Sequence, residues 1–209
     1  MRPLLPALVL VLGAVAPLQA QRHSLAHESS APGTIDWTAA NEFGMEPYVG
    51  VFLDGMVAEN DREMGPLLGV RLSFEPMHRL RFMLDFGYAE VNGVDAVSTG
   101  TSTFTVGNDW LFTMAGAEFD VVPGNTAGLI TLEAGAAWRE TEVERRILGS
   151  EDDPDLGGFS SMAVIAPGVA LVHALSPRGA VRLGVQDMII DVDEDPTHSP
   201  AFTLGVVFR

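Results

Sequence analysis

The chain of 209 residues contains no cysteine and no lysine. Without cysteine it forms no disulfide and has no thiolate for catalysis or metal binding. Its 12 basic residues are all arginine, and its 28 acidic residues give a formal net charge of −16. Phosphate contacts need clustered lysine and arginine, so this composition argues against nucleic-acid binding.

After residue 20 the sequence also lacks any apolar run near the ~18 residues of a membrane-spanning helix. The first 20 residues are different: Arg2 precedes an apolar stretch at 4–15, and the small residue Ala20 follows. This three-part pattern predicts a secretory signal peptide over 1–20, cleaved before Gln21. The alternative is an uncleaved membrane anchor, which the shortness of the apolar stretch disfavours.

Helical patterning is missing as well. Residues 21–45 show little periodicity and are predicted to form a flexible leader. From residue 46 onward, apolar residues alternate with small or polar ones, which is typical of β-strands. We predict one all-β domain over 46–209 with eight strands: 46–54, 63–74, 80–90, 109–121, 128–140, 160–173, 180–191 and 200–209.

The predicted connections alternate in character along the chain. Three are short and contain proline: 75–79, 123–127 and 176–179. The others are longer or more acidic: 55–62, 91–108, 141–159 and 192–199. If consecutive strands are antiparallel, all short turns fall at one end. An even strand number with short periplasmic turns and longer extracellular loops is typical of bacterial transmembrane barrels.

The two faces of the predicted strands differ in chemistry. In 80–90, Leu80, Phe82, Leu84, Phe86 and Tyr88 alternate with a set that includes charged residues. We expect the apolar face to contact lipid and the polar face to line a narrow lumen, which eight strands just fill with side chains. The expected interior polar cluster is Arg71, Arg81, Asp85, Glu118, Glu133 and Arg182. It is interpreted as a structural salt-bridge network, with a narrow ion path as the alternative.

Three residues disturb the alternation. Asp187 falls in the apolar phase, which indicates either a bulge or a position above the bilayer. Pro167 lies within a strand and predicts a bulge, because proline cannot donate to the ladder. The apolar phase changes near Thr113, which predicts a bulge or a register change there.

The signal peptide, the eight strands, the loop asymmetry and the ending AFTLGVVFR together resemble the small outer-membrane β-barrels of the OmpA/OmpX-like class. The resemblance implies an eight-stranded antiparallel up-and-down transmembrane β-barrel in the outer membrane, whose last strand pairs with 46–54. It also implies outer-membrane lipids, lipopolysaccharide and the outer-membrane assembly machinery as partners. The assembly signal would be Phe202, Leu204, Val206 and Phe208. Arg209 departs from the pattern, which usually stops at the aromatic ring.

The remaining polar residues predict little chemistry. The acidic loops suggest weak binding of divalent cations, but DVDED at 191–195 is no EF-hand, because Pro196 and Phe202 occupy its glycine and glutamate positions. His23 and His27 lie in the leader. His173 and Ser176 invite comparison with lipid A deacylases, yet no matching motif surrounds them.

We therefore expect an outer-membrane protein of structural or surface-interaction role, with no enzyme activity, cofactor or metal site. The alternative is a soluble periplasmic lipocalin-like barrel that binds an apolar ligand. In that barrel the apolar face of each strand would point inward.

Overall fold

The computed structural model of the chain describes residues 42–55, 63–77, 79–92, 97–98, 102–147, 158–191 and 196–209. The predicted signal peptide, most of the predicted leader and most of the acidic loop residues lie outside these ranges. Within the described ranges, no helix is long and apolar enough to cross a membrane.

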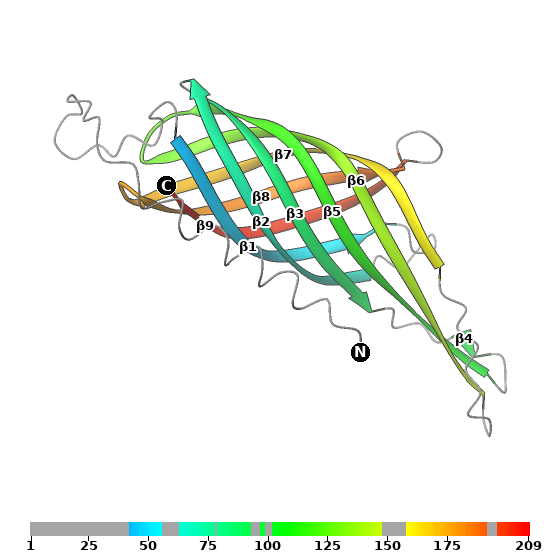
Figure 1. Cartoon of the computed structure of the whole chain (residues 1–209). Helices are drawn as coiled ribbons and strands as arrows, with labels where there is room; N and C mark the ends of the chain where they lie inside the picture. Colours follow the sequence, from blue (N-terminus) through cyan, green and yellow to red (C-terminus); the bar gives the residue numbers. More distant parts are fainter. Residues whose placement is uncertain are drawn as a thin grey trace, which may run out of the picture. The chain divides into compact units, whose positions relative to one another are not determined.

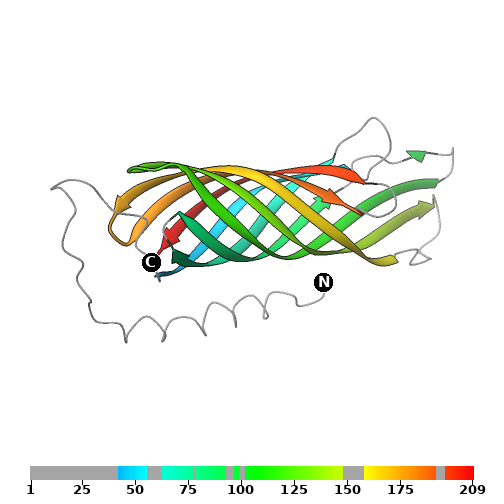
Figure 2. The ribbon, with the colours of Figure 1, turned by 90° about the horizontal axis from the view of Figure 1, so that it is seen from above.

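The described residues form nine strands, and all neighbouring pairs are antiparallel. They are β1 (Glu42–Asp54), β2 (Glu63–Met77), β3 (Leu80–Asn92), β4 (Val97–Ser98), β5 (Ser102–Val122), β6 (Thr126–Ile147), β7 (Gly158–Ser176), β8 (Gly179–Ile190) and β9 (Thr197–Phe208). The two-residue β4 pairs only with the far end of β5, while β3 pairs with both β2 and β5. The other eight strands form a ring around a common axis (Figures 1 and 2).

The ring is closed by pairing between its first and last strands. β1 pairs with β9 in a register that runs from Met45 opposite Phe208 to Phe52 opposite Ala201. The predicted closed, eight-stranded antiparallel barrel is therefore confirmed, and so is the pairing of the last strand with the first. Closure leaves no strand edge within the ring.

Several strands are longer than the sequence pattern predicts. β1 begins at Glu42 rather than at residue 46, and β5 and β6 continue well beyond the barrel strands next to them. Ser102–Gly107 of β5 pairs with Glu142–Ile147 of β6, so much of the predicted loops 91–108 and 141–159 is paired strand. The β5 segment contains Thr103, Thr105 and Val106, which favour strands, whereas the β6 segment is mostly charged and lacks the apolar alternation that marked the other strands.

The bulge predicted near Thr113 is wrong. β5 pairs with β3 without a shift from Phe119 to Gly107, and its pairing with β6 is equally regular through this region. The unbroken register turns Trp110, Phe112 and Met114 into the barrel, where all three are buried. The prediction failed because it assumed that large apolar side chains face outward along the whole strand.

The bulge predicted at Pro167 is also wrong. Pro167 lies opposite Leu132 in a regular β6–β7 ladder. On the β8 side the ladder is interrupted at Ala166 and Pro167 and then resumes in the same register at Gly168. Proline lacks a backbone N–H, and the sheet accommodates it because two residues of β7 stay unpaired with β8, without an inserted residue.

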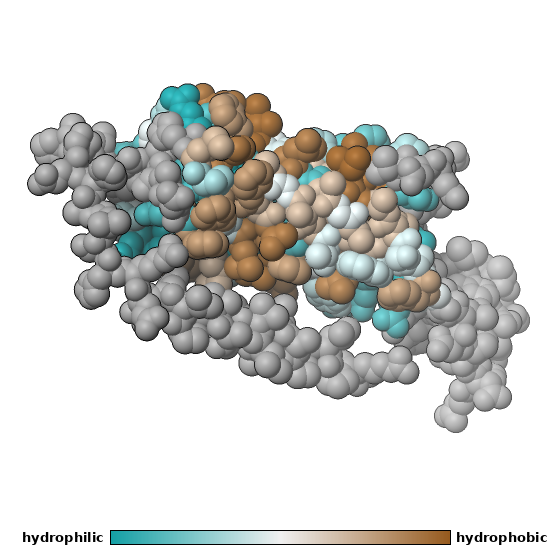
Figure 3. Space-filling model, turned by 45° about the horizontal axis from the view of Figure 1, so that its top comes forward, coloured by the Kyte–Doolittle hydropathy of each residue, from teal (hydrophilic) through white to brown (hydrophobic). Residues whose placement is uncertain are grey.

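The inner and outer faces of the barrel have opposite chemistry. Large apolar side chains such as Phe82, Leu132 and Phe202 point outward and are about half exposed. Charged side chains such as Arg71 and Glu133 point inward and are buried. Apolar residues accordingly gather over the visible barrel wall in the space-filling view (Figure 3). This is the reverse of a water-soluble domain, whose charges lie on its surface.

The pairing between β1 and β9, which closes the ring, leads to a prediction at Gly50 of β1. A Cβ atom at Gly50 would collide with the backbone carbonyl of Phe202 in β9. Gly50→Val should therefore weaken strand closure and lower the free energy of unfolding by about 1–3 kcal/mol. The change is measured by titration with urea, in which the folded fraction at each urea concentration is read from heat-modifiable migration in SDS gels. The matched control is Gly158→Val, because a Cβ at Gly158 meets no atom within 4 Å. An equal loss in both variants would contradict the close approach at Gly50.

Candidate functional site

The lumen near the short turns is occupied by ion pairs centred on arginine. Arg71 of β2 reaches three carboxylates on three other strands. Its guanidinium nitrogens lie 2.5 Å from Asp85 of β3, 3.3 Å from Glu46 of β1 and 3.5 Å from Glu133 of β6. One side chain thereby connects four strands through the interior.

Two further arginines extend these contacts. Arg81 of β3 lies 3.1 Å from Glu75, 3.1 Å from Glu118 and 3.4 Å from Asp120. Arg182 of β8 contacts Glu118 and lies 3.6 Å from Glu46. Because Glu46 and Glu118 are each shared between two arginines, the pairs form one continuous network. Below, the ionic network means Glu46, Arg71, Glu75, Arg81, Asp85, Glu118, Asp120, Glu133, Arg182 and Arg209.

Arg209 carries the ionic network to the mouth of the barrel near the short turns. It continues the inward phase of β9, and its side chain is only 7% exposed. The guanidinium lies 3.2 Å from Glu75 of β2 and 3.5 Å from Glu42 of β1, while its backbone N–H donates to the carbonyl of Arg178. Arg209, the residue that departs from the expected ending, therefore ties the last strand to the first two.

The structure places all six residues of the expected interior cluster in the ionic network: Arg71, Arg81, Asp85, Glu118, Glu133 and Arg182. The ionic network also contains four residues that the sequence pattern did not predict there: Glu46, Glu75, Asp120 and Arg209. Glu46 and Asp120 lie in the inward phase of their strands, so alternation alone gave a usable signal for them. Glu75 was assigned to a turn, which hid its inward direction.

Six carboxylates face four guanidinium groups in the ionic network. Each arginine is therefore shared among several acids rather than paired with one. Neutral donors supplement them: the Tyr48 hydroxyl donates to Asp85 (2.7 Å), and the Gln186 amide donates to Glu133 (2.6 Å). Buried charges are tolerated when ion pairs and hydrogen bonds satisfy them together.

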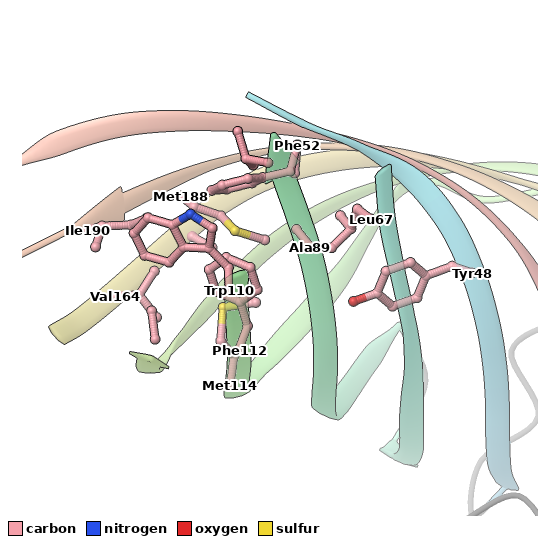
Figure 4. Close-up of a cluster of buried hydrophobic side chains, with 14 residues drawn as sticks. Tyr48, Phe52, Leu67, Ala89, Trp110, Phe112, Met114, Val164, Met188 and Ile190 are labelled. Carbon is pink, nitrogen blue, oxygen red and sulfur yellow. The ribbon is translucent and has the colours of Figure 1, made fainter. Parts of the chain in front are cut away.

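The lumen toward the long loops has a different lining. Figure 4 shows a group of buried aromatic and aliphatic side chains contributed by several strands. Phe52 lies 5.2 Å from Phe112 and 5.7 Å from Trp110 between ring centroids, and the rings of Trp110 and Phe112 are nearly parallel at 5.8 Å. We call this group the aromatic plug: Tyr48, Phe52, Leu67, Ala89, Val91, Trp110, Phe112, Met114, Ala137, Val164, Ala166, Met188, Ile190 and Ala201.

Hydrogen bonds fix the aromatic plug on its outer side. The indole N–H of Trp110 donates to Asp54 (2.9 Å), and the Asn108 amide donates to the same carboxylate oxygen (3.2 Å). The Thr141 hydroxyl donates to Asn108, and the guanidinium of Arg139 stands 5.5 Å from the Trp110 ring centroid. Burying an indole requires such a partner for its N–H, and Asp54 supplies one.

Together, the ionic network and the aromatic plug hold the strands of the barrel wall in contact through the interior. The ionic network and the aromatic plug place side chains from across the ring in contact, and a barrel of eight strands is just wide enough for its interior to be filled in this way. In the part of the chain that the structure describes, no group of three or more histidine, cysteine or acidic side chains is arranged to hold a metal ion.

The other candidate residues lie apart from the lumen. His173 points outward near a short turn, with Nδ1 2.8 Å from the Thr126 hydroxyl, and Ser176 accepts from the backbone N–H of Arg178. His23 and His27 lie outside the described residues. The side chains of the expected assembly signal all face outward: Phe202, Leu204, Val206 and Phe208.

The ionic network generates a prediction at Arg71. Arg71→Met should lower the free energy of unfolding by about 3–5 kcal/mol, because it leaves buried carboxylates without their counter-charge. Adding Asp85→Asn should restore part of the loss, and a double-mutant cycle in urea measures the coupling. Arg178→Met, in an exposed turn, is the control. Additive effects of the Arg71 and Asp85 changes would count against the ion pair.

Comparisons with known proteins support the fold but not a closer relationship. No sequence-family model and no curated protein sequence matches the chain.

Among solved structures, Ail, the attachment invasion locus protein of Yersinia pestis, is similar with a TM-score of 0.53 and 11% identity over 81% of this chain and 99% of Ail. A second Ail structure, in complex with the heparin analogue sucrose octasulfate, gives a TM-score of 0.51 and 12% identity over 81% of this chain and 99% of that chain. Neisserial surface protein A gives a TM-score of 0.48 and 14% identity over 79% of this chain and 95% of that protein. The closed eight-stranded ring and its similarity to Ail show that the chain has the fold of the small eight-stranded outer-membrane β-barrels.

Proposed function

We propose that this protein is an integral outer-membrane β-barrel with a structural or surface-interaction role and no catalytic activity. One observation carries the proposal: the outer wall exposes large apolar side chains while the charges are buried inside. A continuous apolar surface of this extent marks contact with a membrane or a partner. A closed barrel with all strands paired is one of the few structures that a bilayer tolerates.

The proposed orientation places the short turns in the periplasm and the long loops outside the cell. The sorting of short turns and long loops supports this orientation, and the aromatic side chains support the membrane crossing itself, since they face outward near both ends of the strands, as expected at the two membrane interfaces. Phe82, Phe119 and Phe208 lie toward the short turns, and Tyr88 and Trp138 lie toward the long loops. A signal peptide cleaved before Gln21 and delivery of β9 to the assembly machinery belong to the same proposal.

The filled lumen supports a structural role over conduction. An ion crossing the barrel would have to pass both the aromatic plug and the ionic network, whose arginines each hold two or more carboxylates. The surface-interaction role rests on the acidic long loops and on the extension of β5 and β6 beyond the barrel. We propose lipopolysaccharide and weakly bound divalent cations as partners on that side, and calorimetry with calcium tests the cations.

The soluble lipocalin-like alternative is less well supported. Such a barrel encloses its ligand with inward-facing apolar residues and presents a polar outer wall. Here the outward positions of β9 include Phe202, Leu204 and Val206, and all three are more than 40% exposed. In water this wall would promote aggregation.

A charge placed on the outer wall separates the two proposals. Leu132 lies outward in the barrel part of β6, opposite Ala117 of β5 and Pro167 of β7, and is 57% exposed. In a bilayer, Leu132→Arg should lower the free energy of unfolding by about 2–4 kcal/mol, whereas the same change near an interface costs about 0–1 kcal/mol. On a water-exposed wall, arginine at either position would change the free energy of unfolding by no more than about ±0.5 kcal/mol.

The matched control is Phe159→Arg, near the long-loop end of β7, where the side chain is 72% exposed. Unfolding by urea in lipid vesicles gives both free energies, and membrane fractionation locates the unaltered protein. Recovery of that protein from the soluble periplasm without detergent, or equal small effects of both substitutions, would refute the membrane proposal.

A further inference from the structure

The ionic network contains more acids than bases. Sharing of arginines neutralises most of its acids, but the six carboxylates outnumber the four guanidinium groups by two. At the mouth near the short turns the charges are matched, because Arg81 and Arg209 face Glu75 and Asp120 there. The excess therefore lies deeper in the barrel, where four acids surround the other two arginines: Glu46, Asp85, Glu118 and Glu133.

Three of these four acids have contacts at both carboxylate oxygens. Both oxygens of Glu46 accept from Arg71, at 3.3 and 3.4 Å. Asp85 accepts from Arg71 at one oxygen (2.5 Å) and from the Tyr48 hydroxyl at the other (2.7 Å). Glu118 has an arginine at each of its two oxygens. Ionised carboxylates are thus well satisfied at these three positions.

Glu133 is held differently. Its Oε1 accepts from the neutral amide of Gln186 at 2.6 Å, whereas the guanidinium of Arg71 is 3.5 Å away. Its Oε2 is buried and has no hydrogen-bond partner among the described residues, and neither has the buried hydroxyl of Thr131, two residues earlier on the same inward face of β6. A buried carboxylate oxygen without a donor disfavours the ionised form of the acid.

The charges around Glu133 do not favour its ionised form either. The ionisable side chains near it come from five other strands: Glu46 and Tyr48 of β1, Arg71 of β2, Asp85 of β3, Glu118 of β5 and Arg182 of β8. β7 pairs with β6 at this level and places the neutral Ala166 opposite Glu133. Asp187 of β8 and His198 of β9 pair on the outer wall in a regular register, so the bulge considered at Asp187 is absent. Three other acids thus compete with Glu133 for two guanidinium groups.

A proton is the cation that suits this position. The interior of an eight-stranded barrel is just filled by side chains, and a proton needs no further room. A protonated carboxyl group carries no charge, still accepts from Gln186 at Oε1, and turns Oε2 from an unsatisfied acceptor into a hydroxyl donor. The two guanidinium groups are then left to the three acids that contact them closely.

We propose that Glu133 is a proton-binding site, which the folded barrel holds as a neutral carboxylic acid with its proton on Oε2. The site goes beyond the structural role proposed above, because it makes the folding of the barrel depend on pH. In an unfolded chain a glutamate has a pKa of about 4.3 and is ionised above it. Unfolding therefore releases one proton, and raising the pH above this value favours the unfolded state until Glu133 ionises in the folded barrel as well.

Unfolding of the full chain by urea in lipid vesicles, measured at a series of pH values, tests the site. Above about pH 4.3, the unfolding constant of the unaltered protein divided by that of Glu133→Gln should rise about tenfold per pH unit, since one proton is released. Glutamine has the shape and the neutrality of the protonated acid, so the variant should fold.

The matched control is Asp85→Asn, which removes a carboxylate of the same network that is bound at both oxygens. This variant should keep the pH dependence of the unaltered protein. Equal pH dependence in the unaltered protein and in Glu133→Gln would overturn the proposal, and so would its loss in Asp85→Asn.

A second measurement needs no variant to refold. The infrared spectrum of the unaltered barrel at neutral pH should contain the carbonyl stretch of a protonated carboxyl group, which shifts on exchange into heavy water. Absence of that band refutes the bound proton. Where Glu133→Gln folds, the band should be missing from its spectrum, and a band that persists there places the proton on another acid and refutes the assignment to Glu133.

Discussion

The backbone pairing between β1 and β9 is the interaction on which the rest of the structure depends. It converts a row of antiparallel hairpins into a ring, so that no strand in the barrel is left with an open edge. Closure at eight strands also fixes how wide the interior is, and at this width side chains alone fill it. The close approach of Gly50 to the β9 backbone and the reach of Arg209 to Glu42 and Glu75 both belong to this seam.

The confined interior is divided into two parts with different physics. Toward the short turns, four arginines and six acids neutralise one another by sharing partners, because little water is available to solvate an unpaired charge. Toward the long loops, aromatic and aliphatic side chains fill the same cross-section, and hydrogen bonds to Asp54 hold their outer side. Tyr48 joins the two parts, since its hydroxyl donates to Asp85 while its ring belongs to the aromatic plug. The charges of the barrel strands thus lie inside, and the outer wall stays apolar.

Strand alternation predicted the number of strands, their order and the inward direction of Arg71, Arg81 and Glu133, because in any strand the side chains alternate between two faces. It failed at Trp110, Phe112 and Met114, where large apolar side chains point inward. Alternation separates two faces but does not say which face is which when both are apolar. It also failed at Pro167, because the sequence shows that an N–H is missing but not how the neighbouring strand adapts.

The sequence by itself determined the all-β class, the even number of strands and the sorting of short and long connections, since these follow from local periodicity and turn residues. Only the tertiary structure decided which charges meet. Glu46 and Arg182 are 136 positions apart in the sequence and come together because ring closure places β1 next to β9, which pairs in turn with β8. Contacts of this kind depend on register and on curvature, and neither is written in the pattern of a single strand.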